Sequence, residues 1–278
     1  LEVVYNRETG ESLTLKARTL PDLLEMQVER YGERAYLAVP AEPGRYRETS
    51  FREVDKESER IAKALYTHGV RQKDRVGYLS PNRPDFGIST YGVLKLGGAV
   101  VPMAFSAPQD VLKHMVSNSD TAFLVVAAPF LESARTLKAK NPNIRKIFVL
   151  DNIPNLNEGE ISLATWKEET PIALPKVEIS PDDVALILYT SGTTKLPKGA
   201  PLTHKNLLFN MEASRLAWEN SFTDEEMTLG WLPFFHVMGL PHEFWKNLYV
   251  GVRYAFPRLK PGPPTPDQLI ASLRESGA

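Results

Sequence analysis

Short apolar runs alternate with helical patterns between residues 75 and 150, and this alternation constrains the fold more than any other feature of the chain. The runs are rich in Val, Ile, Leu and Phe, as strands buried on both faces are. We expect strands at 76–79, 99–101, 122–127 and 146–150, and helices at 84–96, 108–117 and 131–140. This order predicts an α/β fold, with a parallel sheet, helices on its faces and right-handed crossovers.

Helix signals also stand outside this region. Residues 20–31 place apolar side chains on one face, as an amphipathic helix does. Ser50 and Glu53 form a capping box for a second helix, which Gly69 closes. Thr265 and Gln268 form another, with a proline at N1, and predict a third helix over 268–276. Later in the chain we expect a helix after Thr203, strands at 227–231 and 252–256, and a helix at 243–249.

The segment from Tyr189 to Gly199 reads Tyr-Thr-Ser-Gly-Thr-Thr-Lys-Leu-Pro-Lys-Gly and follows an apolar strand pattern at 184–189. A buried strand delivers such a loop to the carboxyl edge of a sheet, where α/β proteins bind ligands. Hydroxyl groups, glycine backbone and a lysine suit the oxygens of a polyphosphate. The pattern G-x-x-x-x-G-K-[ST] of P-loop ATPases does not fit, because Lys198 precedes the second glycine. An ordinary polar turn is the alternative interpretation.

The eleven-residue string resembles the signature loop of the adenylate-forming superfamily, which comprises acyl-CoA synthetases, peptide-synthetase adenylation domains, luciferases and the adenylation domains of carboxylic acid reductases. The superfamily form is Tyr-Thr-Ser-Gly-Thr-Thr-Gly-x-Pro-Lys-Gly, and this chain departs from it at Lys195. If that position needs a positive φ, lysine there costs on the order of 1 kcal/mol, which an added charge near a triphosphate would offset.

The resemblance implies a binding loop for ATP. The residues that would hold the phosphates are Thr190, Ser191, Gly192, Thr193, Thr194, Lys198 and Gly199. Lys198 and Thr193 are the candidates for a direct catalytic role. Mg²⁺ would bridge phosphate oxygens, as it does in other phosphoryl-transfer sites, but the resemblance identifies no metal-ligating residue in this chain.

A second motif begins at Trp231 and reads Trp-Leu-Pro-Phe-Phe-His-Val-Met-Gly-Leu. It resembles the superfamily segment Leu-Pro-x-Phe-His-x-x-Gly, whose aromatic residue and histidine line a carboxylate pocket. The pocket residues implied here are Phe235, His236, Met238 and Gly239. Phe234 and Trp245 add to an apolar or aromatic character, although such side chains also fill cores.

Composition limits the other functions of the chain. Lys plus Arg number 33 and Asp plus Glu number 34, so no overall positive field favours nucleic acid. The chain has no cysteine, which excludes disulfides, cysteine-ligated metals and a cysteine nucleophile within it. No run approaches the roughly 18 apolar residues of a membrane span, and the start lacks a signal-peptide pattern. We expect a soluble, cytoplasmic protein without integral membrane contact.

The resemblance implies a two-step reaction. A small carboxylic acid and ATP give an acyl-adenylate and pyrophosphate, and a thiol of CoA or of a carrier-protein phosphopantetheine then accepts the acyl group. Acceptor choice stays open, with a carrier domain as one partner. A noncatalytic nucleotide-binding or interaction module with the same fold is the alternative function.

The resemblance covers nearly all of this chain, yet the chain corresponds to about the first half of a superfamily member. We therefore expect 1–278 to be a partial AMP-binding domain, made of two α/β subdomains with largely parallel sheets flanked by helices. The first subdomain would span 72–216 and carry the phosphate loop, and 12–71 with 225–278 would form part of the second. We expect these residues alone not to sustain turnover.

Overall fold

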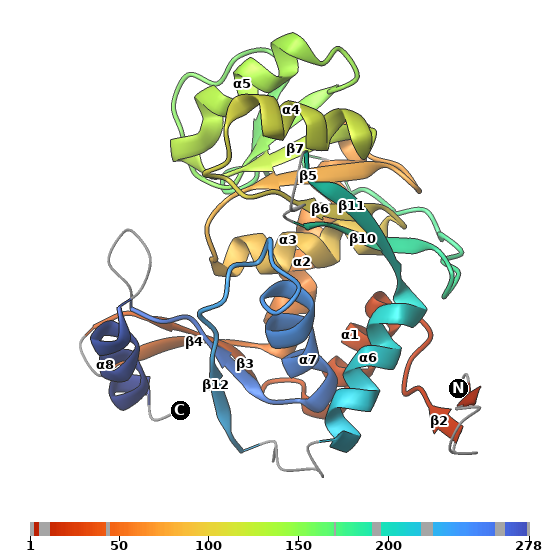
Figure 1. Cartoon of the computed structure of the whole chain (residues 1–278), viewed down its shortest axis with the longest axis vertical. Coiled ribbons are helices and arrows are strands. Elements are labelled where there is room, and N and C mark those ends of the chain that lie inside the picture. The colour runs from red at the N-terminus through yellow and green to blue at the C-terminus, as the bar shows by residue number, and fades with distance from the viewer. Residues whose placement is uncertain are drawn as a thin grey trace. The chain divides into compact units, whose positions relative to one another are not determined.

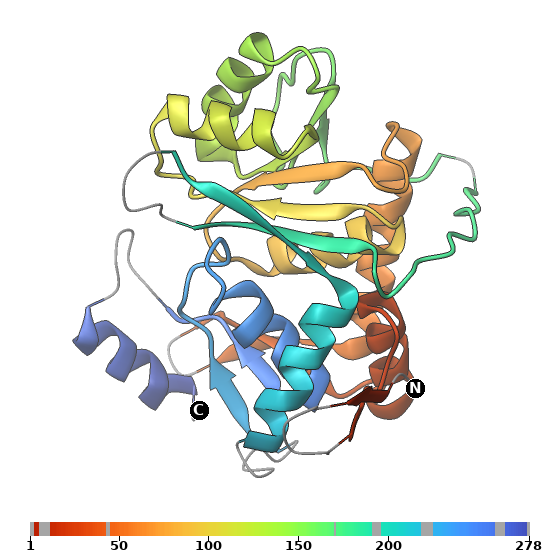
Figure 2. The same cartoon turned by 45° about the vertical axis from the view of Figure 1, so that its right-hand side comes forward.

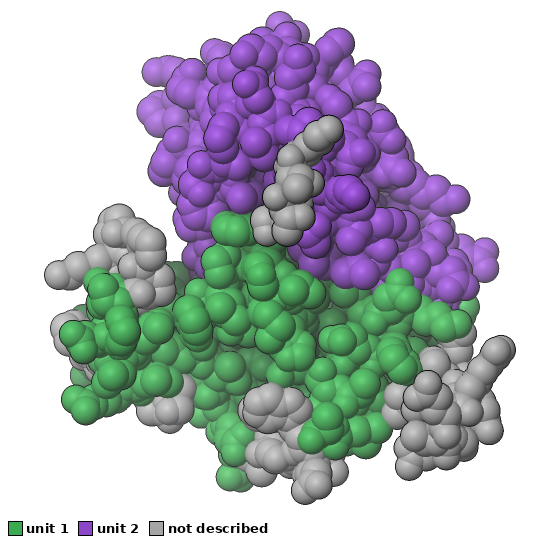
Figure 3. All heavy atoms as spheres, in the orientation of Figure 1, with its two compact units in different colours: residues 1–56, 204–278 green, residues 57–203 purple. Residues whose placement is uncertain are grey.

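The computed structural model describes residues 3–5, 12–42, 45–169, 171–190, 196–217, 225–258 and 265–276. The chain forms two compact units, one of residues 57–203 and the other of residues 1–56 with 204–278 (Figure 3). The first unit differs from the 72–216 expected from the sequence, since it includes most of helix α2 (Phe51–Thr67) and excludes helix α6 (His204–Ala217).

The 57–203 unit is built on a sheet of seven strands in the order β11-β10-β6-β5-β7-β8-β9. The strands are β5 (Arg75–Leu79), β6 (Ala99–Pro102), β7 (Thr121–Val126), β8 (Lys146–Val149), β9 (Glu160–Ser162), β10 (Val184–Thr190) and β11 (Lys198–Thr203). All neighbouring strands pair in parallel except β10 and β11, which are antiparallel. The expected α/β class with a largely parallel sheet is confirmed.

Helices cover both faces of this sheet. Helices α4 (Gln109–Asn118) and α5 (Leu131–Lys140) lie together on one face, and α3 (Pro84–Lys95) lies on the other (Figures 1 and 2). A short 3₁₀ turn, η1 (Ala128–Phe130), leads into α5. The face under α4 and α5 is packed with buried apolar side chains, among them Leu112, Met115, Leu124, Val126, Leu131 and Ile147. The expected order of strands and helices between 75 and 150 is confirmed.

The sequence did not indicate strands β9 and β11 of this unit, and β11 is the one that borders the signature string. Gly199 and Pro201 are poor strand formers, and proline lacks the donor that a central strand needs. β11 accommodates them because it lies at the edge of the sheet, with β10 as its one neighbour.

The other unit holds a four-stranded sheet in the order β12-β13-β3-β4. Its strands are β3 (Ala35–Pro40), β4 (Tyr46–Ser50), β12 (Met227–Leu229) and β13 (Arg253–Ala255), and a separate pair joins β1 (Val3–Tyr5) to β2 (Ser12–Thr14). β12, β13 and β3 are parallel, whereas β4 is antiparallel to β3. The strand expected at 227–231 ends at Leu229, and the ring of Tyr254 lies against Gly230, where a Cβ would come within 1.8 Å of it.

Helices α1 (Leu20–Tyr31), α6, α7 (Lys246–Val250) and α8 (Pro266–Ser276) complete this unit. The capping boxes expected at Ser50 and Thr265 are present in the hydrogen bonds to Glu53 and Gln268. The helix expected over 243–249 is instead divided between α7 and a π-helix, η2 (Leu240–Trp245). Single π-turns of this kind are rare and occur frequently at functional sites.

Candidate functional site

The signature string spans the connection between β10 and β11. The two strands pair Thr190 with Lys198 and Tyr189 with Gly199, so the second residue of the string pairs with the tenth, and the first with the eleventh, at the base of the loop. The side chains of Thr190 and Lys198 are both exposed. Ser191, Gly192, Thr193, Thr194 and Lys195 lie outside the described residues.

The sheet places this base at a ligand-binding edge. β10 runs parallel to β6, with Leu186 paired to Val100, and β6 runs parallel to β5. The carboxyl end of β10, at Thr190, therefore lies at the same edge as the carboxyl ends of β5 and β6. Open α/β sheets bind their ligands at that edge.

Gly199 is explained by packing within the hairpin. A Cβ there would lie 3.2 Å from the Tyr189 ring, 3.2 Å from Asn118 Oδ1 and 3.3 Å from Ile187 Cγ2. These separations are tighter than ordinary van der Waals contact. The absence of a side chain thus lets the Tyr189 ring cross the paired strand.

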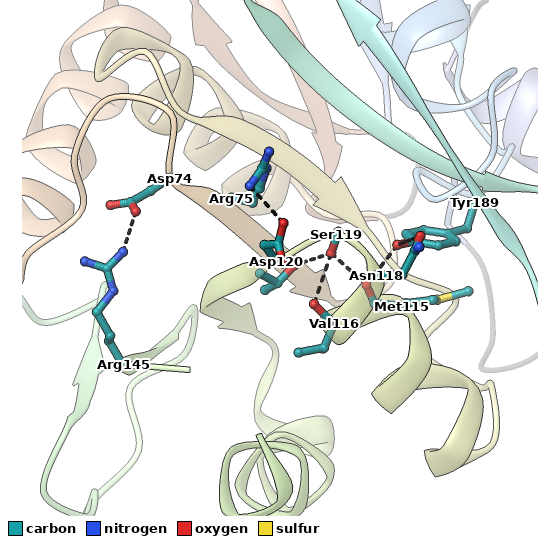
Figure 4. Close-up of polar contacts among 10 residues, drawn as sticks. Asp74, Arg75, Met115, Val116, Asn118, Ser119, Asp120, Arg145 and Tyr189 are labelled. Atoms are coloured by element: carbon teal, nitrogen blue, oxygen red, sulfur yellow. Dashed lines mark hydrogen bonds and ion pairs between the residues drawn. The ribbon is translucent and has the colours of Figure 1, made fainter. Parts of the chain in front are cut away.

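Tyr189 joins the hairpin to helix α4. Its hydroxyl lies 2.9 Å from the Met115 carbonyl oxygen and 2.9 Å from Asn118 Oδ1 (Figure 4). Burial is the main cause that raises the pKa of this phenol, so the group stays protonated and able to donate. Figure 4 also shows the ion pair between Arg75 and Asp120, and Asp120 comes shortly after α4 in the chain. Sequence reasoning missed this role of Tyr189, since its partners are more than 70 residues away.

The second motif forms a tight turn in the other unit. The N–H of His236 donates to the Pro233 carbonyl oxygen at 2.9 Å, and the N–H of Gly239 donates to the His236 carbonyl oxygen at 2.9 Å. A Cβ on Gly239 would lie only 2.0 Å from the Pro233 carbonyl oxygen and 2.7 Å from that of Leu232. Glycine is therefore required sterically, because both obstructing atoms belong to the backbone.

The turn presents part of its side-chain set to the surface. His236 and Met238 are exposed, and Phe235 is half-buried. The N–H of Met238 donates to His236 Nδ1 at 3.2 Å, so a neutral imidazole carries its proton on Nε2. Nε2 is the ring atom left to donate to an acid oxygen.

Two aromatic residues considered for the acid pocket belong to the core. Phe234 is 1% exposed and its ring packs against those of Phe244, Tyr254 and Phe256 at 5.1, 6.2 and 6.2 Å between centroids. Trp245 is fully buried. The core interpretation, left open for both in the sequence, accounts for these side chains.

Glu243 is a titratable residue of this region that the sequence did not single out. Burial raises the pKa of its carboxyl to about 7, against the opposing effects of the Leu232 N–H and of Lys246. The Leu232 N–H lies 3.3 Å from Glu243 Oε2, so the carboxylate joins the π-helix to the segment that enters the turn. The pKa values of His242 and Lys246 are lowered, in both cases chiefly by burial.

His204 has a structural role at the start of a helix. It is buried at the first position of α6, and its Nδ1 accepts the Leu20 N–H at 3.2 Å.

Across the described ranges, no group of three or more His, Asp or Glu side chains is arranged to hold a metal ion. Nor does any helix in those ranges have the length and apolar character to cross a membrane.

Comparison with known proteins places these two motifs in one family. Crotonobetaine/carnitine–CoA ligase of Escherichia coli O6:K15:H31 (strain 536 / UPEC) is 31% identical over 209 residues, which are 74% of this chain and 40% of that protein. A long-chain-fatty-acid–CoA ligase from Archaeoglobus fulgidus has a TM-score of 0.81 at 25% identity, over 100% of this chain and 53% of its own. An anthranilate–CoA ligase solved with anthranoyl-AMP has a TM-score of 0.76 at 25% identity, over 90% of this chain and 46% of its own.

The chain thus spans about 40% of the length of its curated relative and about half that of the solved structures. The model of the family described as AMP-binding enzyme matches residues 24–278. Since that match runs through both motifs and nearly the whole sequence, the resemblance to adenylate-forming enzymes is confirmed, and this protein belongs to the AMP-binding enzyme family.

Proposed function

We propose that this chain supplies the ATP-phosphate loop and part of the acid pocket of a carboxylate-adenylating acid–thiol ligase. The observation that carries the proposal is the pairing of Thr190 with Lys198 at the carboxyl edge of the sheet, with the signature string between them. Membership of the AMP-binding enzyme family supports it, as do relatives named as CoA ligases.

In the first step a carboxylate oxygen of the acid attacks the α-phosphorus of ATP. A bond from that oxygen to phosphorus forms, the bond to the β-phosphate oxygen breaks, and pyrophosphate leaves. Lys198 and the donors of Thr190, Ser191, Gly192, Thr193, Thr194 and Gly199 would hold the departing phosphates. Charge stabilisation and positioning supply catalysis here, so the protein needs no nucleophile.

In the second step a thiol attacks the acyl carbonyl, AMP leaves with the pair of electrons from the mixed anhydride, and the thiol proton is released. CoA is the favoured acceptor because the relatives above are named as CoA ligases. A carrier-protein phosphopantetheine is the alternative. Mg²⁺ enters as MgATP, and no step is assigned to a protein-bound metal. A cytoplasmic setting, with ATP as substrate, is part of the proposal.

The acid would lie against Phe235, His236, Met238 and Gly239. His236 Nε2 can donate to its carboxylate, and the exposed apolar side chains of Trp231, Val237 and Met238 favour an apolar or aromatic acid. The relatives' names cover acids as different as crotonobetaine and anthranilate, so the specificity rests on this chain's own side chains.

Titration calorimetry of the 278-residue chain with MgATP and with magnesium pyrophosphate tests the phosphate loop. Lys198→Gln should weaken both by at least about tenfold, since a charge-assisted bond is worth roughly 1.5–3 kcal/mol. Lys140→Gln removes an exposed charge from the end of α5 and serves as the matched control.

Equal affinities for the parent chain and Lys198→Gln would contradict the assignment. Acid-dependent ATP–pyrophosphate exchange across an acid panel separates the alternatives. Exchange by this chain would refute the expectation that it does not turn over. Nucleotide binding without exchange by a longer chain that contains these residues would favour a noncatalytic module, for which the departure at Lys195 is the motivating observation.

A further inference from the structure

Both strands that bear the signature loop are held by the same helix. On the β10 side, the Tyr189 hydroxyl contacts the Met115 carbonyl oxygen and Asn118 Oδ1, each at 2.9 Å (Figure 4). On the β11 side, His114 Nε2 lies 2.9 Å from the carbonyl oxygen of Pro197. Each contact is one residue from the pair Thr190–Lys198 that closes the base of the loop.

The chemistry of these contacts determines which group donates in each hydrogen bond. A carbonyl oxygen only accepts, so His114 carries a proton on Nε2 and donates it to Pro197. The Tyr189 hydroxyl has one proton, which it gives to Met115 or Asn118. His114, Met115 and Asn118 lie within five consecutive residues of α4, so one rigid element holds both strands. We call these three residues the α4 tether.

We propose that the α4 tether sets the position of Lys198 for phosphate binding, and that His114 is a positioning residue of the nucleotide site. This inference rests on the proposed function of Lys198.

The physical reason lies next to the lysine. Lys198 is exposed on an edge strand, and its side chain is long and rotamer-rich, so ordering it on a phosphate costs entropy. The His114 bond fixes the carbonyl of the residue just before it, and the backbone at Lys198 is therefore already placed when the nucleotide arrives. A preorganised donor binds more tightly because less freedom is lost on binding.

Three variants of the 278-residue chain test the tether. His114→Leu removes the donor at similar volume, His114→Gln keeps an N–H donor on a flexible side chain, and Tyr189→Phe removes the other contact. Ser117→Ala is the matched control, because Ser117 lies on α4 but donates to Asn141. Each variant is assayed for the Kd of MgATP and for amide hydrogen exchange at Lys198 and Gly199 by NMR.

We expect His114→Leu to raise the Kd about fivefold, as the loss of one hydrogen bond does, and to speed exchange at Lys198. Tyr189→Phe should have an effect of similar size, and His114→Gln should stay within twofold of the parent chain, as should Ser117→Ala. The proposal is overturned if His114→Leu leaves both the Kd and the exchange rate unchanged. It is also overturned if Ser117→Ala weakens binding as much.

The two readouts separate failures of the two proposals. If the parent chain binds neither MgATP nor magnesium pyrophosphate, the proposed function of Lys198 fails, while amide exchange still reports whether His114 restrains the hairpin. If His114→Leu does not fold, Tyr189→Phe decides, and unchanged binding and exchange in that variant would overturn the tether.

Discussion

The two motifs of this protein are held in place in different ways. The base of the phosphate loop lies on an edge strand and is held by a few hydrogen bonds to α4, such as that from His114 to Pro197. The His236 turn is held by close backbone contact at Gly239 and by a buried aromatic core around Phe234. We infer that substitutions at the base of the phosphate loop chiefly weaken ligand binding, whereas substitutions in the His236 turn chiefly lower the free energy of unfolding.

Gly239→Ala should give the largest effect. Its Cβ would lie 2.0 Å from one carbonyl oxygen and 2.7 Å from another, and neither is the end of a flexible side chain. Overpacking of this kind costs typically 1–3 kcal/mol and more where backbone must move, so we expect about 3 kcal/mol or above. Calorimetric unfolding measures it, with Met238→Ala on the exposed side of the same turn as control. A loss below about 1 kcal/mol would show that packing does not hold this turn.

Glu243→Gln tests the stability of the region around the His236 turn through its dependence on pH. The pKa of Glu243 is raised from 4.5 to about 7, so the folded state binds this proton more tightly than the unfolded state. The free energy of unfolding that it contributes is present below about pH 4.5 and is lost as pH rises to about 7. With allowance for solvent screening the loss is on the order of 1–2 kcal/mol.

The difference between parent and Glu243→Gln reports this carboxyl together with its coupling to Lys246. Burial lowers the pKa of His242, whose contribution runs the other way with pH and is common to both chains. Burial also lowers the pKa of Lys246, but the Glu243 charge opposes that shift, so the contribution of Lys246 changes when Glu243 is replaced. Denaturant unfolding of both chains at several pH values between 4 and 8 measures how the difference in their free energy of unfolding changes with pH. If the free energies of unfolding of the two chains change with pH in parallel, Glu243 is not shielded from water as its position indicates.

The same contrast explains what the sequence could predict. The alternation from 75 to 150 and the capping boxes at Ser50 and Thr265 depend on local pattern, and they appear as expected. β11 could not be predicted from its own residues, because an edge position makes up for Gly199 and Pro201.

Site residues divide in the same way. The segments Thr190–Gly199 and Leu232–Gly239 match continuous sequence motifs, and so their residues could be identified from the sequence alone. His114 could not, since its partner is 83 residues away and a single histidine on a helix carries no signal. Glu243 was missed because its raised pKa depends on burial, which the sequence around it does not reveal.

Gly199→Ala is the direct counterpart of Gly239→Ala and should be the milder change. Its Cβ would meet the Tyr189 ring and Asn118 Oδ1 at 3.2 Å, and both are side-chain atoms that can yield by a few tenths of an ångström. We expect a loss of about 1 kcal/mol in unfolding free energy. The MgATP affinity should fall by several fold, because the displaced atoms are those that join Tyr189 to α4.

The two alanine variants therefore separate stability from binding. Calorimetric unfolding and MgATP titration of both, under one set of conditions, give a ratio of effects for each region. If Gly199→Ala costs as much stability as Gly239→Ala, or leaves MgATP binding unchanged, the hairpin base is held by packing as the turn is. The role assigned to the hydrogen bonds of α4 would then be wrong.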